Sequence, residues 1–138
     1  MESKDIKRLR KENASGWLEL TKSESVPLMI DALIDAPPEY RFNKTELQNR
    51  SGVNRNTVSK YIDLLVELGI IEKIPDTEPQ EYRLNELGRV TQEILELNNA
   101  INAIRLGQDV EVKDEEELSV NVPDTGYEAT RDILKISQ

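Results

Sequence analysis

RFNKTELQNRSGVNRNTVSKYIDLLVELGIIEKI, the stretch from Arg41 to Ile74, decides the fold of this 138-residue chain. It holds two segments with helical apolar spacing, separated by Gly52. Asn43, followed three residues later by Glu46, is the N-x-x-E signature of a helix start. Gly52 then ends the helix, because glycine readily adopts the left-handed backbone conformation that closes one. The stretch therefore predicts a short first helix between Asn43 and Gly52.

A second helix follows this turn directly. Asn54 is a good N-cap, and Val58, Ile62 and Leu65 recur at spacings of four and three. These three residues predict one buried stripe, and Gly69 ends the helix. Two short helices joined by a tight glycine turn, with polar residues at the start of the second, form a helix-turn-helix.

The face opposite the buried stripe carries the functional signal. With the apolar residues turned inward, Arg55, Asn56, Ser59 and Lys60 point outward from the first turns of the second helix. Arginine can bind guanine edges and asparagine adenine edges, while serine, lysine and the neighbouring Tyr61 hydroxyl suit phosphates. The alternative is that these polar residues only solvate an amphipathic helix. The expected DNA-contacting residues are Lys44, Thr45, Arg55, Asn56, Thr57, Ser59, Lys60 and Tyr61.

Charge is distributed unevenly along the chain. The segment from Arg41 to Lys60 has five basic residues and one acidic residue, a net charge of +4 in a chain of net charge −9. Residues 1–75 are neutral overall, and residues 76–138 carry the whole excess of nine negative charges. An acidic balance is unusual for a DNA-binding protein, because phosphate neutralisation dominates affinity. Either the C-terminal half faces away from DNA, or the protein works at high intracellular salt, and the two explanations are compatible.

Composition excludes several classes of function. The chain has no cysteine and no histidine, which removes disulfides, thiolate metal sites and the commonest general base. Its carboxylates lie in runs on solvated segments, and it has no glycine loop for phosphates, so we expect neither an enzyme nor a bound cofactor or metal. No apolar run approaches membrane-spanning length, and the charged N-terminus is not a signal peptide. These features predict a cytoplasmic protein without a membrane partner.

Upstream of the motif, residues 1–16 form a basic N-terminal arm that either lies on DNA or is solvated. Residues 17–84 are expected to form the folded domain, with the single tryptophan, Trp17, packed on its core. Downstream, two short strands, Ile70 to Ile74 and Glu81 to Leu84, flank a proline-bounded loop and predict a β-hairpin wing. The acidic loop would repel phosphate, so no minor-groove contact is expected from it.

A long helix is predicted over residues 85–107, capped by Asn85 and closed by Gly107. Its apolar residues recur at spacings of 3, 4, 3, 4 and 3, a narrow seam typical of two-stranded pairing. The residues of this expected dimer interface are Leu87, Val90, Ile94, Leu97, Ile101 and Ile104. The alternative is that the helix folds back on its own domain. Residues 108–138 are an acidic C-terminal extension with a possible short strand and last helix.

This order of elements resembles that of winged helix-turn-helix transcription regulators, most of all the small acidic ones of halophilic archaea and their viruses. The resemblance rests on FNKTELQNRSGVNRNTVSKYIDLLVELGIIEKI (Phe42 to Ile74) and EYRLNELGRVTQEILELNNAIN (Glu81 to Asn102), and covers about residues 17–104. It implies a homodimer that binds a palindromic operator with helix 54–68 in the major groove.

The expected fold class is mainly α with a small β-hairpin, a winged helix-turn-helix with a long C-terminal dimerisation helix. The first functional hypothesis is a sequence-specific regulator that binds double-stranded DNA. The second is a protein-protein adaptor in transcription or replication machinery, which the acidic wing and net charge favour. No feature of the sequence indicates a small-molecule effector.

Overall fold

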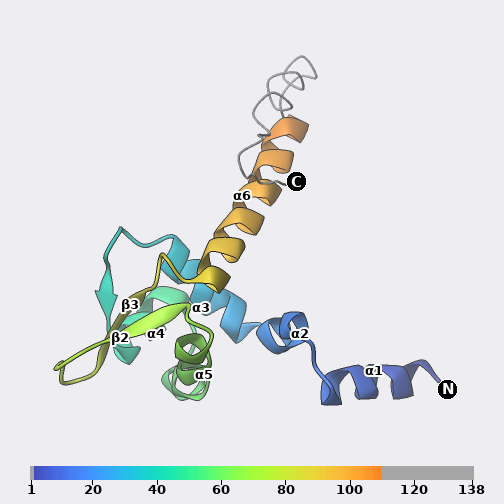
Figure 1. The fold of residues 1–138 in the computed structure, drawn as a ribbon, viewed down its shortest axis with the longest axis horizontal. Coiled ribbons are helices and arrows are strands. Elements are labelled where there is room, and N and C mark those ends of the chain that lie inside the picture. Colours follow the sequence, from blue (N-terminus) through green and yellow to red (C-terminus); the bar gives the residue numbers. More distant parts are fainter. Residues whose placement is uncertain (1, 110–138) are drawn as a thin grey trace. The chain divides into compact units, whose positions relative to one another are not determined.

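The computed structural model describes residues 2–109 and divides into two units, residues 1–95 and residues 96–138. The first unit contains eight elements and the start of a ninth, α6, whose remainder is the described part of the second unit (Figure 1). The elements are α1 (Ser3–Glu12), α2 (Gly16–Thr21), α3 (Ser25–Ile34), β1 (Arg41–Phe42), α4 (Lys44–Ser51), α5 (Arg55–Glu67), β2 (Ile71–Ile74), β3 (Glu81–Leu84) and α6 (Arg89–Asp109). The strand and last helix expected beyond residue 109 lie outside the described residues.

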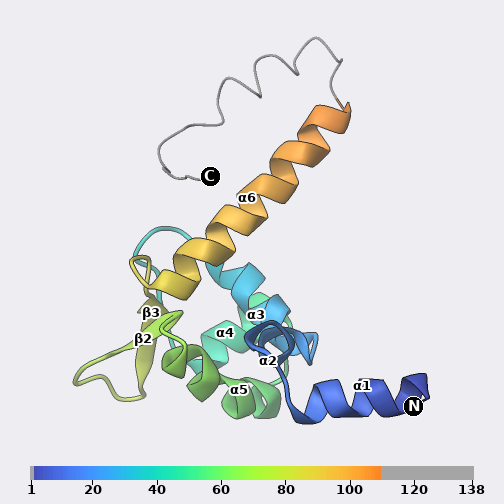
Figure 2. The same ribbon diagram turned by 45° about the vertical axis from the view of Figure 1, so that its right-hand side comes forward.

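The three strands form one antiparallel sheet in the order β1-β3-β2. The β2–β3 hairpin was predicted, and its register pairs Ile71 with Leu84 and Ile74 with Glu81. Strand β1 was not predicted, because two residues are too few to show an alternating pattern. Figures 1 and 2 show the sheet along one side of the helices, with the β2–β3 loop projecting away from them.

The core lies where α3, α4 and α5 meet the inner face of this sheet. Phe42 and Leu47 are fully buried, and the Phe42 ring stacks on that of Tyr82 with centroids 5.8 Å apart. The other buried members of this core cluster are Val26, Met29, Ile30, Ala32, Leu33, Val53, Val58, Ile62, Leu65, Ile70 and Ile71. A helix, a helix-turn-helix and an antiparallel hairpin around one core make a winged helix-turn-helix, and the predicted fold class is confirmed.

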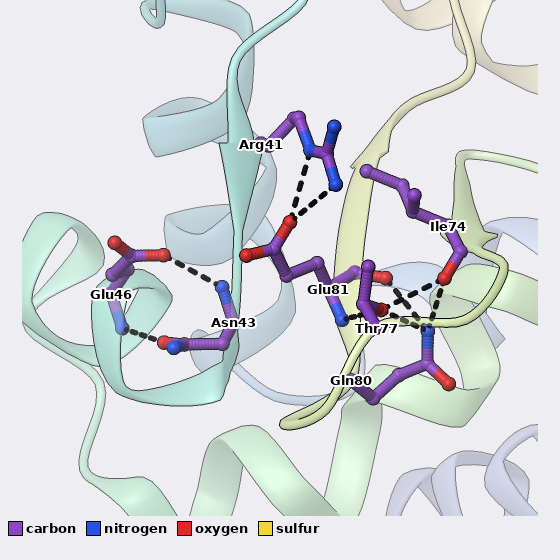
Figure 3. A network of polar contacts seen from close by, with 7 residues as sticks. All are labelled: Arg41, Asn43, Glu46, Ile74, Thr77, Gln80 and Glu81. Carbon is purple, nitrogen blue, oxygen red and sulfur yellow. Dashed lines mark hydrogen bonds and ion pairs between the residues drawn. The ribbon is translucent and has the colours of Figure 1, made fainter.

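The predicted turn between the two helices is present in detail. The Asn43 side chain accepts a hydrogen bond from the Glu46 amide, and the Glu46 carboxylate accepts one from the Asn43 amide, both at 2.9 Å (Figure 3). This capping box starts α4. Gly52 ends α4 at a φ of 80°, in the left-handed region. The Ser51 hydroxyl, which accepts from the Val53 amide, holds the chain in the turn before α5.

Helix α5 is closed by a Schellman motif. The Gly69 amide donates to Val66 O and the Ile70 amide to Leu65 O, each at 3.0 Å. Gly69 adopts a φ of 76°, which its missing side chain allows. The motif turns the chain from the buried stripe of α5 directly into β2.

Helix α6 begins later than the sequence predicts. Asn85 is not its cap, because the Asn85 side chain donates to Gly69 O at 3.0 Å. The helix starts instead after Gly88, whose carbonyl accepts from the Gln92 amide at 2.9 Å. The buried Thr91 hydroxyl also reaches the end of α5, donating to Ile70 O at 3.3 Å. The start of α6 is therefore set by partners in the turn that follows α5, 16 to 21 residues earlier in the chain.

The six expected interface residues do not form one stripe. Leu87 precedes the helix and is 89% exposed, and Val90 and Ile94 are half-buried against the core of their own domain. The remaining three, Leu97, Ile101 and Ile104, are exposed and form what we call the α6 stripe. Gly107 does not end the helix, which continues to Asp109. The apolar residues that are evenly spaced in the sequence are therefore partly packed on the core and partly exposed.

The N-terminal region also departs from expectation. Residues 3–12 of the predicted basic arm are helical, forming α1, and this helix buries none of its residues. Trp17 is 62% exposed, so its predicted place in the core is wrong. In the six-residue helix α2, Leu20 packs on the core in place of Trp17.

Candidate nucleic-acid interface

The outward face of α5 is as the sequence predicts. Arg55, Asn56, Ser59 and Lys60 are all exposed, and we call them the polar face of α5. The three residues of the opposite stripe, Val58, Ile62 and Leu65, are at most 1% exposed. Because this stripe fixes the rotation of the helix, the polar face is presented to solvent over the first two turns.

The two other predicted contacts on α5 are less accessible. Thr57 is half-buried, and its amide donates to the Asn54 cap at 3.0 Å. Tyr61 is half-buried against the core, and the Lys60 ammonium lies over its ring, 5.3 Å from the centroid. A cation–π contact of this kind holds the lysine close to the helix surface. Tyr61 therefore positions Lys60 as well as offering its own hydroxyl.

Lys44 and Thr45, the predicted contacts on α4, lie in the first turn of that helix. The Arg55 guanidinium crosses to them and donates from Nη1 to Thr45 Oγ1 at 3.0 Å. The N-terminal turns of the two helices are thereby joined. Beside this bond is a crevice of about 330 Å³, lined also by Pro79 and Gln80 of the hairpin loop. We call it the α4–wing crevice.

Two of the five cations in this region have structural roles that the sequence did not reveal. Arg41 forms an ion pair with Glu81 at 2.8 Å (Figure 3). Arg50 donates to Ala32 O at 3.0 Å and to Asp35 O at 3.2 Å, which closes the end of α3. These partners are 15 to 40 residues away in the chain, so no local pattern could have indicated them.

The sequence-based net charge of +4 therefore overstates the charge available to a ligand. Within the described residues, Lys44, Arg55 and Lys60 are the cations of this region that form neither an ion pair nor a hydrogen bond to a backbone carbonyl. They lie at the first turn of α4 and over the first two turns of α5. A negatively charged ligand would be attracted to this smaller set.

The hairpin loop is held by a compact hydrogen-bond network, seen in Figure 3. Thr77 Oγ1 accepts from the Glu81 amide and donates to Ile74 O, both at 2.8 Å. Gln80 Nε2 donates to Ile74 O at 3.0 Å. The acidic residues Asp76 and Glu78 are exposed on this loop, as predicted. The loop therefore presents a fixed backbone with negative charge at its tip.

Tyr82 is a buried wall residue of the α4–wing crevice. Burial, and after it the negative charge of Asp63, raises the pKa of its hydroxyl above the ordinary value of 10.0. The hydroxyl therefore stays neutral at physiological pH and adds no negative charge to the crevice.

Residues 2–109 present neither a metal-binding cluster nor a membrane-spanning helix. No group of three or more histidine, cysteine, aspartate or glutamate residues there is arranged to hold a metal ion. Nor does any helix in this part of the chain combine the length and apolarity needed to cross a bilayer.

No family model matches the chain. An uncharacterised HTH-type transcriptional regulator of Mycobacterium tuberculosis is 43% identical over 47 residues, which are 32% of this chain and 30% of that protein. The chain thus matches less than a third of the length of this relative.

Two solved structures are similar at low identity. One is a MarR family transcriptional regulator from Silicibacter pomeroyi, with 17% identity over 98% of this chain and 84% of that one and a TM-score of 0.48. The other is the adhesin competence repressor of Streptococcus pyogenes, with 22% identity over 91% of both chains and a TM-score of 0.40. The resemblance to regulators of halophilic archaea stays a prediction, and the winged helix-turn-helix assignment rests on the packing described above.

Proposed function

We propose that this chain is a transcription regulator that binds specific double-stranded DNA sequences, with α5 in the major groove. One observation carries the proposal: the polar face of α5 is exposed, and within the described residues its Arg55 and Lys60, like Lys44 of α4, form no ion pair. A major groove admits one α-helix, and contacts to its base edges come from the first turns of a recognition helix. The curated name of the mycobacterial relative, an HTH-type transcriptional regulator, agrees with this assignment.

The side chains of this face suit different parts of a duplex. The Asn56 amide has the donor and acceptor that match an adenine edge. Ser59 and Lys60 offer a hydroxyl and an ammonium to phosphates. Asn56 would therefore provide sequence discrimination, and its neighbours would provide affinity and orientation.

The proposed active form is a homodimer. Leu97, Ile101 and Ile104 are 49%, 45% and 63% exposed at spacings of four and three, and an exposed stripe of this kind marks an interface. Two copies related by a two-fold axis would match a palindrome with half-sites about one duplex turn, roughly 34–36 Å, apart. Linking two modules also raises affinity, which an acidic protein with few phosphate contacts needs.

The alternative function is that of a protein-protein adaptor. It is favoured by the net charge of −9 and by the exposed Asp76 and Glu78 on the wing, since neither feature helps binding to a polyanion. An adaptor would bind a partner protein through the same α5 face and retain no duplex.

Selection from a pool of random duplexes at low salt tests the proposal. We expect enrichment of a palindromic sequence, because a two-fold dimer reads two equal half-sites. Failure to retain any duplex under these conditions would contradict DNA binding and leave the adaptor as the function.

Sedimentation of the wild type and of a Leu97→Asp/Ile101→Asp variant tests the dimer. The wild type should sediment as a dimer at tens of micromolar and the variant as a monomer with unchanged helical content, because a charge in the interface is costly. A matched Asn99→Asp/Asn102→Asp variant adds the same number of negative charges at exposed positions outside the stripe and should stay dimeric. A monomeric wild type would contradict the dimer.

A further inference from the structure

The Arg55 side chain differs in its contacts from the rest of the polar face of α5. Arg55 is the first residue of α5, and its Nη1 is bonded at 3.0 Å to Thr45 Oγ1 on the neighbouring helix. The guanidinium lines the α4–wing crevice, whereas Asn56, Ser59 and Lys60 do not. One residue of the polar face is therefore directed toward a different part of the surface from the other three.

The lining of the crevice is cationic and has no carboxylate. Lys44 and Arg55 are its only charged side chains, and the others are polar or apolar. Three acidic residues lie close to this lining along the chain. Glu46 is engaged in the capping box of α4 and Glu81 in the ion pair with Arg41 (Figure 3), while Glu78 is exposed on the loop and does not line the crevice. The crevice therefore lacks an internal counterion within the described residues and suits a singly charged anion.

The walls of the crevice are fixed before any ligand arrives. Gln80, on the wing side, donates to Ile74 O, Thr77 Oγ1 and Glu81 O at 2.9 to 3.2 Å. On the opposite side, the Arg55 guanidinium donates one of its five N–H groups to Thr45 Oγ1, which holds it in place. The other N–H groups remain available to oxygen atoms of a ligand. A second crevice of similar volume, between the C-terminal end of α3 and the start of α6, carries Glu39 and Glu86 instead and would not attract an anion.

We propose that the α4–wing crevice binds one phosphate diester of the duplex backbone, through Lys44 and through an Arg55 side chain that Thr45 positions. The proposal rests on the DNA binding proposed above. Arg55 is then a backbone contact and not a reader of guanine, and sequence discrimination comes from the other residues of the polar face. The wing contributes a rigid wall beside this phosphate, so its acidic tip need not approach the DNA.

The first test distinguishes a phosphate contact from a base contact. It measures how the affinity of each variant depends on salt and on the duplex sequence. Arg55→Ala should weaken binding to the selected palindrome and to mismatched duplexes by the same factor, about tenfold or more for a charge-assisted contact. It should also reduce the slope of log affinity against log salt by about one for each subunit. Asn56→Ala is the matched comparison, because it should change the preference at one base pair and leave the slope unaltered.

The second test locates the phosphate. A set of duplexes, each with one uncharged methylphosphonate linkage, is titrated with the wild type and with Arg55→Ala. The wild type should lose affinity at each linkage that the protein contacts, and at one linkage in each half-site Arg55→Ala should show a clearly smaller loss than the wild type. Thr45→Val, which keeps the side-chain shape and removes the acceptor oxygen, should weaken wild-type binding but have no effect in the Arg55→Ala background.

The outcomes separate this inference from the function on which it rests. If Arg55→Ala relaxes the preference at one base pair and leaves the salt slope unchanged, Arg55 reads a base and the inference is wrong, although DNA binding stands. If every methylphosphonate affects the wild type and Arg55→Ala equally, the crevice binds no phosphate. If the wild type retains no duplex, both proposals fail together.

Discussion

Helices α5 and α6 have similar apolar spacing and opposite surroundings. In α5 the stripe of Val58, Ile62 and Leu65 is at most 1% exposed, whereas in α6 Leu97 and Ile101 are 49% and 45% exposed. Periodicity of 3 and 4 predicts that a helix has an apolar face in both cases. It does not say whether the same chain or another molecule covers that face. We infer that the buried stripe orients a binding surface, and that the exposed stripe provides the contact with a second copy.

The change from buried to exposed apolar residues occurs within α6. Its first turns resemble α5, because Thr91 is buried and bonded to the end of α5, and Val90 and Ile94 pack on the core. Of the later residues, Leu97, Ile101 and Ile104 are exposed. Helix α6 therefore has a first part that packs on the core of the winged domain and a later part with an exposed apolar stripe.

Truncating one leucine in each stripe should give the largest difference. Leu65→Ala should lower the free energy of unfolding by about 2–5 kcal/mol, because it leaves a cavity in the core. Leu97→Ala should change it by about 0.5 kcal/mol or less, measured at concentrations where the monomer dominates. Urea unfolding followed by circular dichroism gives both values. Equal losses would show that the α6 stripe is covered within a single chain.

The junction between the two regions depends on a close approach at Gly88. A Cβ atom added there would lie 2.3 Å from Gly69 O, in the turn that closes α5. Gly88→Ala should therefore cost about 1–3 kcal/mol in unfolding free energy. Gly16→Ala is the matched control, since nothing lies within 4 Å of its added Cβ, and it should be neutral or slightly stabilising. A neutral Gly88→Ala would mean that α6 is not anchored through this contact.

The sequence predicted those parts of the fold that are encoded by near neighbours. The Asn43–Glu46 capping box, the glycine turns at Gly52 and Gly69, and the rotation of α5 all depend on residues within a few positions of each other. The start of α6 was predicted wrongly, because Asn85 satisfies a carbonyl at Gly69 instead of capping the next helix. Only the tertiary structure makes that partner available.

In the candidate site too, the features set by residues close in the sequence were predicted, and those set by distant partners were not. The exposure of the polar face of α5 was predicted, since it follows from the stripe behind it. The structural roles of Arg41 and Arg50 and the direction of Arg55 were not, because their partners lie on other elements of the fold. A count of charges in the sequence could not distinguish the cations used inside the fold from those left for a ligand.

A smaller effect on the free energy of unfolding should appear at alkaline pH. It concerns Tyr82, which is buried in the core. Folding raises the pKa of Tyr82 above 10.0, so its contribution to stability is complete below that pH and is lost as pH rises through the folded pKa. Chemical unfolding of the wild type should show this decline above about pH 10. Tyr82→Phe removes the ionising group and should show a shallower decline. Identical profiles would exclude a contribution from Tyr82.

The most direct test of the account is the affinity of the selected duplex for a variant with Arg55, Asn56, Ser59 and Lys60 all changed to alanine. Alanine favours the helix and leaves the buried stripe intact, so circular dichroism should show a folded protein. The quadruple variant loses two positive charges. The control Lys22→Ala/Arg89→Ala also loses two, at positions outside α4 and α5.

Fluorescence anisotropy of the labelled duplex should show binding about 100-fold weaker or more for the quadruple variant, because base and phosphate contacts are lost together. The control should bind nearly as the wild type does. A folded quadruple variant with wild-type affinity and an unchanged salt slope would contradict the claim that this face of α5 binds DNA.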